Sequence, residues 1–329
     1  MRMRIVLLLT VLLVPEFVVR PTAADTATAP TAAAVVHANA LWEPPTGLRD
    51  RDLFYGPWGA RLQPDPHALY TFVAPKKTGT NPGVIVRDPQ GRQWHVKQGK
   101  GSGLHSEGPV EVVVSRVLSA VGYHQPPVYY LPSFIIHDPK GTHSEPGGRF
   151  RLDEPSLREV GNWSWDDPSV KGSRPYNGLL VILLTFASWD FKQSNNSIYE
   201  VQHNGRPETW FMVRDLGAAL GGEGHLRATK NDIDKFEQQG FIRGVSNGYV
   251  DFDYGGKRGD LYRRRITVED VRWATSLLAG LDDRQWRDAF RAGGYPNDVS
   301  DRFIQKIKSS IVAGERLTGT PRELARSQW

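Results

Sequence analysis

The chain has 329 residues, of which 39% are hydrophobic and ten are tryptophan, so it is long enough and apolar enough to bury a substantial core. Its 41 Lys and Arg against 36 Asp and Glu give a formal charge of +5, and no basic run concentrates it, which argues against nucleic acid as a partner. The absence of cysteine excludes disulfides, thiolate nucleophiles, Cys-ligated metals and a lipid-modified Cys.

The N-terminal segment has the pattern of a secretory signal peptide. A basic head, MRMR, and an apolar run ending at Val14 are followed by small residues that offer a cleavage site after Ala24. Pro15 and Glu16 break the apolar run, which is shorter than the roughly 20 residues that span a bilayer. We therefore expect a cleaved signal, no stable membrane span, and a protein that is secreted or held in the periplasm or cell envelope. An uncleaved anchor is the alternative.

Residues 25–47 are rich in Ala, Thr and Pro with few large side chains, which is typical of a flexible tether. We expect the fold to begin near Leu48. From there to residue 152, β-branched and aromatic residues between Gly, Pro and Asn turns predict a small sheet. The predicted strands are residues 68–75, 83–88, 93–99 and 127–138.

One helix interrupts these strands. Apolar residues at spacings of three and four line one face of residues 108–121, and Gly122 marks the predicted end of the helix. From residue 153 onward helical patterns dominate, and Thr267 with Asp270 predicts a capping box. The predicted helices of this part are residues 176–189, 267–281, 283–294 and 299–314.

Two further features lie between these helices. Residues 197–217 predict a hairpin that turns at Asn204 and Gly205. The pattern D-x-K-x-x-N occupies residues 190–195, directly behind the apolar run of the first helix. Sheet-rich and helix-rich regions in succession predict an α+β fold.

This succession invites a test for phosphoryl transfer, in which the protein supplies mainly positioning and charge. Such a site needs a Lys on a strand to hold ATP phosphates and an acid to fix that Lys. Lys97 on the third predicted strand and Glu111 in the following helix meet this need. The reaction also needs a carboxylate near the attacking hydroxyl and oxygen ligands for magnesium. Asp190 and Asn195 supply one set, and Asp215 ends the predicted hairpin.

With these residues in place, the chain resembles the protein-kinase-like fold, in an atypical branch similar to HipA, the phosphoinositide kinases and the secretory-pathway or CotH-like kinases. The kinase catalytic loop reads H-R-D-x-K-x-x-N, and its Asp, Lys and Asn are kept as Asp190, Lys192 and Asn195. Asp215, followed by Leu and Gly, matches the metal-binding D-F-G. The motifs span roughly residues 69 to 220.

The resemblance implies a two-lobed fold with a β-rich N-lobe at residues 48–152, carrying one long helix, and a larger helical C-lobe at residues 153–329. It implies ATP and Mg²⁺ as cofactors. The roles that it implies are catalytic base for Asp190, phosphate stabilisation for Lys192, magnesium binding for Asn195 and Asp215, and a phosphate-holding ion pair for Lys97 and Glu111.

The chain also departs from the kinase pattern. Ser188 and Trp189 stand where His-Arg precedes the Asp, and the A-P-E and G-x-G-x-x-G segments are absent. A possible replacement for the glycine-rich loop is KKTGTNPGV, in which Gly79 and Gly83 permit close backbone approach to phosphate. His95 shares the strand face of Lys97, where typical kinases carry a small Ala against the adenine.

These observations predict an exported atypical kinase-like phosphotransferase that uses Mg-ATP on an unknown protein, small-molecule or glycan acceptor. Transfer of AMP by the same site remains open. The main alternative is a degenerate kinase fold that binds nucleotide or acts as an interaction module of the cell envelope. A glycosidase, with paired acids at Asp166 and Asp167 beside several Trp, is less favoured because adjacent carboxylates on an extended chain point apart.

Overall fold

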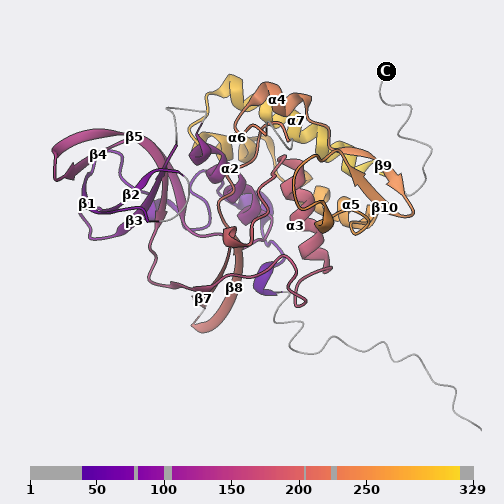
Figure 1. The fold of residues 1–329 in the computed structure, drawn as a ribbon, viewed down its shortest axis with the longest axis horizontal. Helices are drawn as coiled ribbons and strands as arrows, with labels where there is room; N and C mark the ends of the chain where they lie inside the picture. The colour runs from indigo at the N-terminus through magenta and orange to yellow at the C-terminus, as the bar shows by residue number, and fades with distance from the viewer. Residues whose placement is uncertain (1–38, 78–80, 100–105, 204, 224–227, 319–329) are drawn as a thin grey trace, which may run out of the picture.

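The computed structural model describes residues 39–77, 81–99, 106–203, 205–223 and 228–318 (Figure 1). Helices and strands are both well represented, so the α+β class predicted from the sequence is confirmed at that level. A β-barrel lies at one end of the molecule and most of the helices lie at the other, with α2 (Glu107–Ala120) between them (Figure 1).

The barrel closes five strands in the order β1-β2-β3-β5-β4. Neighbouring strands are antiparallel except for β1 and β4, which pair in parallel and close the barrel. Its interior holds large aromatic side chains, including Tyr70, Trp94, Phe134 and Phe150, which meet edge to face or at a tilt. The strands are β1 (Leu69–Pro75), β2 (Gly83–Arg87), β3 (Gln93–Gln98), β4 (Val128–Asp138) and β5 (Gly141–Leu152).

Four of these strands were predicted, and β5 was not. Its sequence, GTHSEPGGRFRL, contains Gly and Pro in its first half, which are usually unfavourable inside a strand. The long hairpin with β4 overrides this local preference, since the pairing runs from Val128 opposite Arg151 to Asp138 opposite Gly141. Gly147 is required there because an added Cβ would lie 2.1 Å from the backbone oxygen of Leu131.

Helix α2 is buried on nearly all sides rather than on one face. Its valines Val113, Val114 and Val117 belong to the same hydrophobic cluster as the helices of the C-terminal part. The helix also contacts β4 and β5 of the barrel, which explains why both of its faces are covered. It ends at Ala120, two residues before Gly122, whose φ of 103° suits glycine just beyond a helix terminus.

The helical part is built on α3, which lies against α5, and on α7, which contacts α5, α6 and α4. The predicted capping box of Thr267 and Asp270 is present, and Asp282 with Gln285 forms a second one. The helix predicted for residues 176–189 ends four residues early, because Ala187 has a left-handed φ of 51°. The helices are α3 (Arg174–Thr185), α4 (Ile233–Gln238), α5 (Val268–Ala279), α6 (Asp283–Ala292) and α7 (Asn297–Glu315).

Two small sheets complete the described fold. The predicted hairpin is confirmed as β7 and β8, and β6 adds a third antiparallel strand. A second hairpin, β9 with β10, was not predicted. The strands are β6 (Leu157–Gly161), β7 (Asn196–His203), β8 (Arg206–Val213), β9 (Ile242–Ser246) and β10 (Tyr249–Phe252).

Part of the expected tether belongs to the fold. Ala40 and Leu41 are buried in the main core, and Trp42 forms a β-bridge with Tyr123, so the prediction of a flexible segment up to residue 47 was wrong for this stretch. Ala40, Leu41 and Trp42 indicated a folded segment, but the average composition of residues 25–47 concealed them. The signal-peptide prediction lies outside the described residues. No helix in the described ranges combines the length and apolar character needed to cross a bilayer.

Candidate functional site

Lys97 lies in β3, where alternate residues face opposite ways. Trp94 and Val96 point into the barrel core, and Lys97 faces α2. Its side chain is only 6% exposed, and its ammonium nitrogen meets three carboxylates, at 2.7 Å from Glu107, 3.4 Å from Glu111 and 3.2 Å from Asp215. A buried Lys needs such partners, because an unpaired charge in the interior costs several kcal/mol.

Glu107 and Glu111 stand one turn apart in the first half of α2, and therefore on the same face. Oε1 of Glu111 also forms an ion pair with Nε of Arg149, at 2.9 Å. Arg149 lies on β5, directly opposite Lys97. Glu107 contacts Lys230 as well and accepts a hydrogen bond of 2.6 Å from the side-chain amide of Asn81. The contact predicted between Lys97 and Glu111 is thus present, within a larger network of opposite charges.

The network shifts the protonation of its members. Burial disfavours the charged form of Lys97, but Glu111, Asp215 and Glu107 outweigh it and raise the pKa of Lys97. Partial desolvation acts against the Asp215 carboxylate, whose side chain is 49% exposed, yet Lys97 and Arg149 lower the pKa of Asp215 to about 2. Both shifts favour the charged forms of Lys97 and Asp215 near neutral pH, so this pair brings opposite charges together beside α2.

The low pKa of Asp215 predicts an acid-dependent loss of stability. Its ordinary pKa is about 3.9, so the stabilisation is fully present above that pH and is lost as pH falls through about 2. The melting temperature of the wild type should therefore decline relative to Asp215→Asn between about pH 4 and pH 2. A constant difference between the two proteins across this range, measured by circular dichroism, would contradict the pairing of Asp215.

Asp190 lies just beyond α3, in a segment anchored by its neighbours. Phe191 is buried in the core and packs edge to face on Trp165. The Lys192 ammonium lies 3.0 Å from the Asp190 carboxylate, and the Asn195 side-chain amide donates to the Asp190 backbone oxygen at 3.0 Å. The three residues of the predicted D-x-K-x-x-N motif are therefore in contact with one another.

The Asp190 and Asp215 segments are joined by backbone hydrogen bonds. The Arg214 amide donates to the Asn195 oxygen at 2.7 Å, and the Trp189 amide donates to the Ala218 oxygen at 3.2 Å. Both segments thus meet at the open end of the β7–β8 hairpin, where Asn196 pairs with Val213.

Asp215 itself has a left-handed φ of 53°, an uncommon conformation that Asp tolerates better than most residues. Gly217 lies against α2, where an added Cβ would stand 2.5 Å from the Glu107 Cβ. The Asp-Leu-Gly sequence therefore allows the segment to approach the helix that carries the partners of Lys97.

A cavity of about 620 Å³ opens beside this segment. Asp190 lines it, together with the basic residues Lys192, Lys257 and Arg258 and the indole of Trp189. Asp190 therefore borders a space of the size that small-molecule sites occupy.

Of the two glycines predicted for the phosphate loop, only Gly83 lies within the described residues. Gly79 lies outside the described residues. Gly83 begins β2 directly opposite Lys97, and an added Cβ there would lie 2.2 Å from the Val96 backbone oxygen, so only glycine fits. Burial, and after it the charge of Lys97, lower the pKa of Lys76, which places that Lys near the same charge network.

The structure also describes His95 and the Trp residues near Asp166 and Asp167, which the sequence singled out. His95 is half-buried, and desolvation followed by the charge of Arg151 lowers its pKa, so its ring is neutral at physiological pH. The aromatic platform required by the glycosidase alternative is absent at the expected place, because Trp163 and Trp165 are buried in the core. Asp166 instead forms surface ion pairs with Lys171 and Arg258.

Sequence reasoning missed Glu107, Arg149 and Lys230. The spacing of Glu107 and Glu111 by one helical turn was a usable signal. Arg149 was hidden because its strand was not predicted, so its register opposite Lys97 could not be known. Lys230 lies outside the helices and strands and carries no local pattern.

Comparison with known proteins does not supply a family. No protein-family model, no curated protein and no solved structure matches the chain. What the chain does must therefore be inferred from its own residues.

Proposed function

We propose that the chain is an atypical kinase-like phosphotransferase that uses Mg-ATP to phosphorylate a protein, small-molecule or glycan acceptor. The observation that carries this proposal is the buried Lys97 on the third strand, which is paired with Glu111 of the following helix and lies 3.2 Å from Asp215. A strand Lys paired with a helix Glu, next to the magnesium-binding Asp, is the arrangement that protein kinases require.

In the proposed fold, the barrel with α2 acts as the N-lobe and the helical part acts as the C-lobe. The Lys97 ammonium and the glycine-permitted backbone at Gly83 would hold phosphates of ATP. Asp215 and Asn195 offer the oxygen ligands that Mg²⁺ prefers, and they sit at the same end of one hairpin. ATP supplies the phosphoryl group, and bound magnesium offsets its negative charge.

The proposed transfer step uses the residues beside the 620 Å³ cavity. The Asp190 carboxylate takes the proton of the acceptor hydroxyl while that oxygen bonds to the γ-phosphorus and the bond to ADP breaks. Lys192, whose ammonium lies 3.0 Å from Asp190, would steady the transferring phosphate. The sequence-based expectation that the mature protein is exported stands beside this proposal, and a donor of phosphoryl groups must then reach it outside the cytoplasm.

A catalytically degenerate kinase fold is the second candidate. The half-buried His95 favours it, because the ring occupies the strand face where a small residue would make room for adenine. This candidate predicts either nucleotide binding without transfer or no nucleotide binding at all.

The first test is a thermal-unfolding scan with and without ATP and Mg²⁺. A ligand at about 100 times its dissociation constant stabilises the native state by roughly 2.7 kcal/mol, which gives a measurable rise in melting temperature. We expect the rise to require magnesium and to be lost in Asp215→Ala. Asp234→Ala, which removes a surface carboxylate, should keep it. The absence of any rise with ATP, GTP or ADP in the wild type would contradict the nucleotide site.

A further inference from the structure

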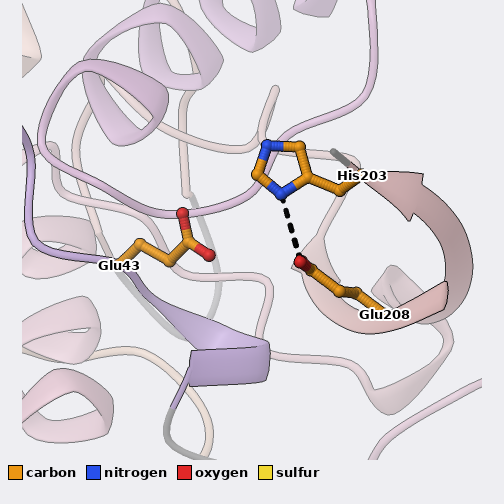
Figure 2. Close-up of side chains that lie close together, drawn as sticks. All are labelled: Glu43, His203 and Glu208. Carbon is orange, nitrogen blue, oxygen red and sulfur yellow. Dashed lines mark hydrogen bonds and ion pairs between the residues drawn. The ribbon is translucent and has the colours of Figure 1, made fainter. Parts of the chain in front are cut away.

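A second cluster of metal-ligating side chains lies at the other end of the β7–β8 hairpin. His203 and Glu208 flank its tip, where His203 pairs with Arg206, whereas Asn195 precedes and Asp215 follows the strands at its open end. Glu43, from the N-terminal stretch, joins them (Figure 2), and one ligand atom from each of the three residues lies within 4.8 Å of the others. We propose that Glu43, His203 and Glu208 bind a divalent transition-metal ion, Zn²⁺ in the first instance.

The spacing of two ligand atoms already fits such an ion. The Nδ1 atom of His203 lies 3.2 Å from Oε1 and 3.3 Å from Oε2 of Glu208. Zinc binds His nitrogen and carboxylate oxygen at about 2.0–2.1 Å, so two ligand atoms of a tetrahedral site stand about 3.3 Å apart. The imidazole selects against Mg²⁺ and Ca²⁺, which prefer oxygen ligands alone, and in favour of zinc and its neighbours.

Surrounding contacts hold Glu208 and the backbone of Glu43 in place. The Trp210 indole donates a hydrogen bond of 2.9 Å to Oε2 of Glu208, and the ring of His124 stacks on that indole at 4.2 Å. The backbone amide of Glu43 donates to the Gly122 oxygen at 3.0 Å. Such outer contacts orient the ligands of metal sites and raise their affinity.

The cluster also opens into a cavity of about 350 Å³, which Glu43 and His203 line. Gln125 lines the same cavity, and the residue is buried, with only 4% of its surface exposed. Its Oε1 atom has no hydrogen-bond partner among the described residues, although burying a polar atom without one costs about 1–3 kcal/mol. Three protein ligands beside a polar cavity leave a coordination position for water or a small ligand.

The simpler interpretation is a hydrogen-bonded His–Glu pair without a metal. The chain contains a matched example of such a pair, because His143 lies 3.0 Å from Glu145 and both His side chains are 36% exposed. His143 is not part of the cluster that Glu43 completes. It therefore serves as a control that separates a built site from general zinc binding by surface histidines.

The test is isothermal titration of the tag-free full chain with zinc chloride after removal of metals by EDTA. We expect one zinc ion per chain, with an association constant that falls at least about tenfold in His203→Asn, Glu208→Gln and Glu43→Gln. His143→Asn should bind zinc as the wild type does. Equal losses in His203→Asn and His143→Asn, or the absence of stoichiometric binding in the wild type, would overturn the proposal.

Two additions keep the test independent of folding and of the nucleotide site. Co²⁺ in place of zinc should give intense visible d–d bands of a tetrahedral site in the wild type, and these bands should be lost in Glu43→Gln, whose change lies outside the hairpin. Asp215→Ala should bind zinc normally, since the zinc site does not depend on the proposed phosphotransfer. Magnesium in excess should leave the cobalt bands unchanged, and their loss would contradict the selection by imidazole.

Discussion

Lys97→Met is expected to lower the free energy of unfolding by about 3–5 kcal/mol, because it removes one partner from a buried charge network. The side chain of Lys97 is 6% exposed, and its ammonium group contacts Glu107, Glu111 and Asp215. Without it the three carboxylates face one another with fewer cations to balance them. Urea unfolding of the two proteins, followed by tryptophan fluorescence, measures the difference.

The matched control is Lys171→Met, which removes a Lys that pairs at 2.7 Å with the exposed Asp166. Surface ion pairs contribute about 0–1 kcal/mol, so this change should have a small effect. A similar small effect of Lys97→Met would show that the network does not hold the barrel to α2. The same variant should also lose the melting-temperature rise with Mg-ATP, and retention of that rise would remove Lys97 from the proposed phosphate site.

Local patterns predicted the parts of the site that short-range physics determines. Lys97 alternates with Trp94 and Val96, so its strand and its face followed from period-two reasoning. Glu111 lies in a helix with regular apolar spacing, and Asp190 follows an apolar run that forms α3. These elements were predictable because each carries its own periodicity.

The long-range parts were not predictable in the same way. Arg149 reaches the site because β5 pairs with both β3 and β4, and closure of a barrel depends on pairing between segments distant in sequence. The approach of Gly217 to α2 depends on the same closure. The residues 39–42 were missed because a few apolar side chains anchor a segment whose average composition resembles a tether.

In the proposed active site, the residues that stabilise the fold differ from the residue that would carry out the chemistry. The network of Lys97, Glu107 and Glu111 is buried and ties the barrel to α2, so changes there alter stability and nucleotide binding together. The Asp190 carboxylate borders the cavity, and its contact with Lys192 is on the surface side. Asp190 is therefore the position at which chemistry can be removed with the least effect on the fold.

Asp190→Asn is accordingly expected to reduce phosphoryl transfer by about 10²- to 10⁴-fold, which is the usual contribution of a general base. The amide keeps the size of the side chain but cannot take the proton of the acceptor hydroxyl. Transfer of the labelled γ-phosphoryl group from ATP to protein and to water measures the loss. Asp234→Asn, the same chemical change at a surface position paired with Arg302, should leave transfer unchanged.

The melting-temperature rise with Mg-ATP should survive in Asp190→Asn, because the proposed nucleotide contacts are made by Lys97 and Asp215 rather than by Asp190. Loss of transfer with retained binding would place Asp190 at the chemical step. Undiminished transfer in Asp190→Asn, with loss in Asp215→Ala, would show that another group takes the proton. A wild type that binds Mg-ATP without transferring phosphate would contradict the phosphotransferase and favour the degenerate kinase fold. Ser188 and Trp189, which replace the His-Arg before Asp190, would then be the physical reason for the missing transfer.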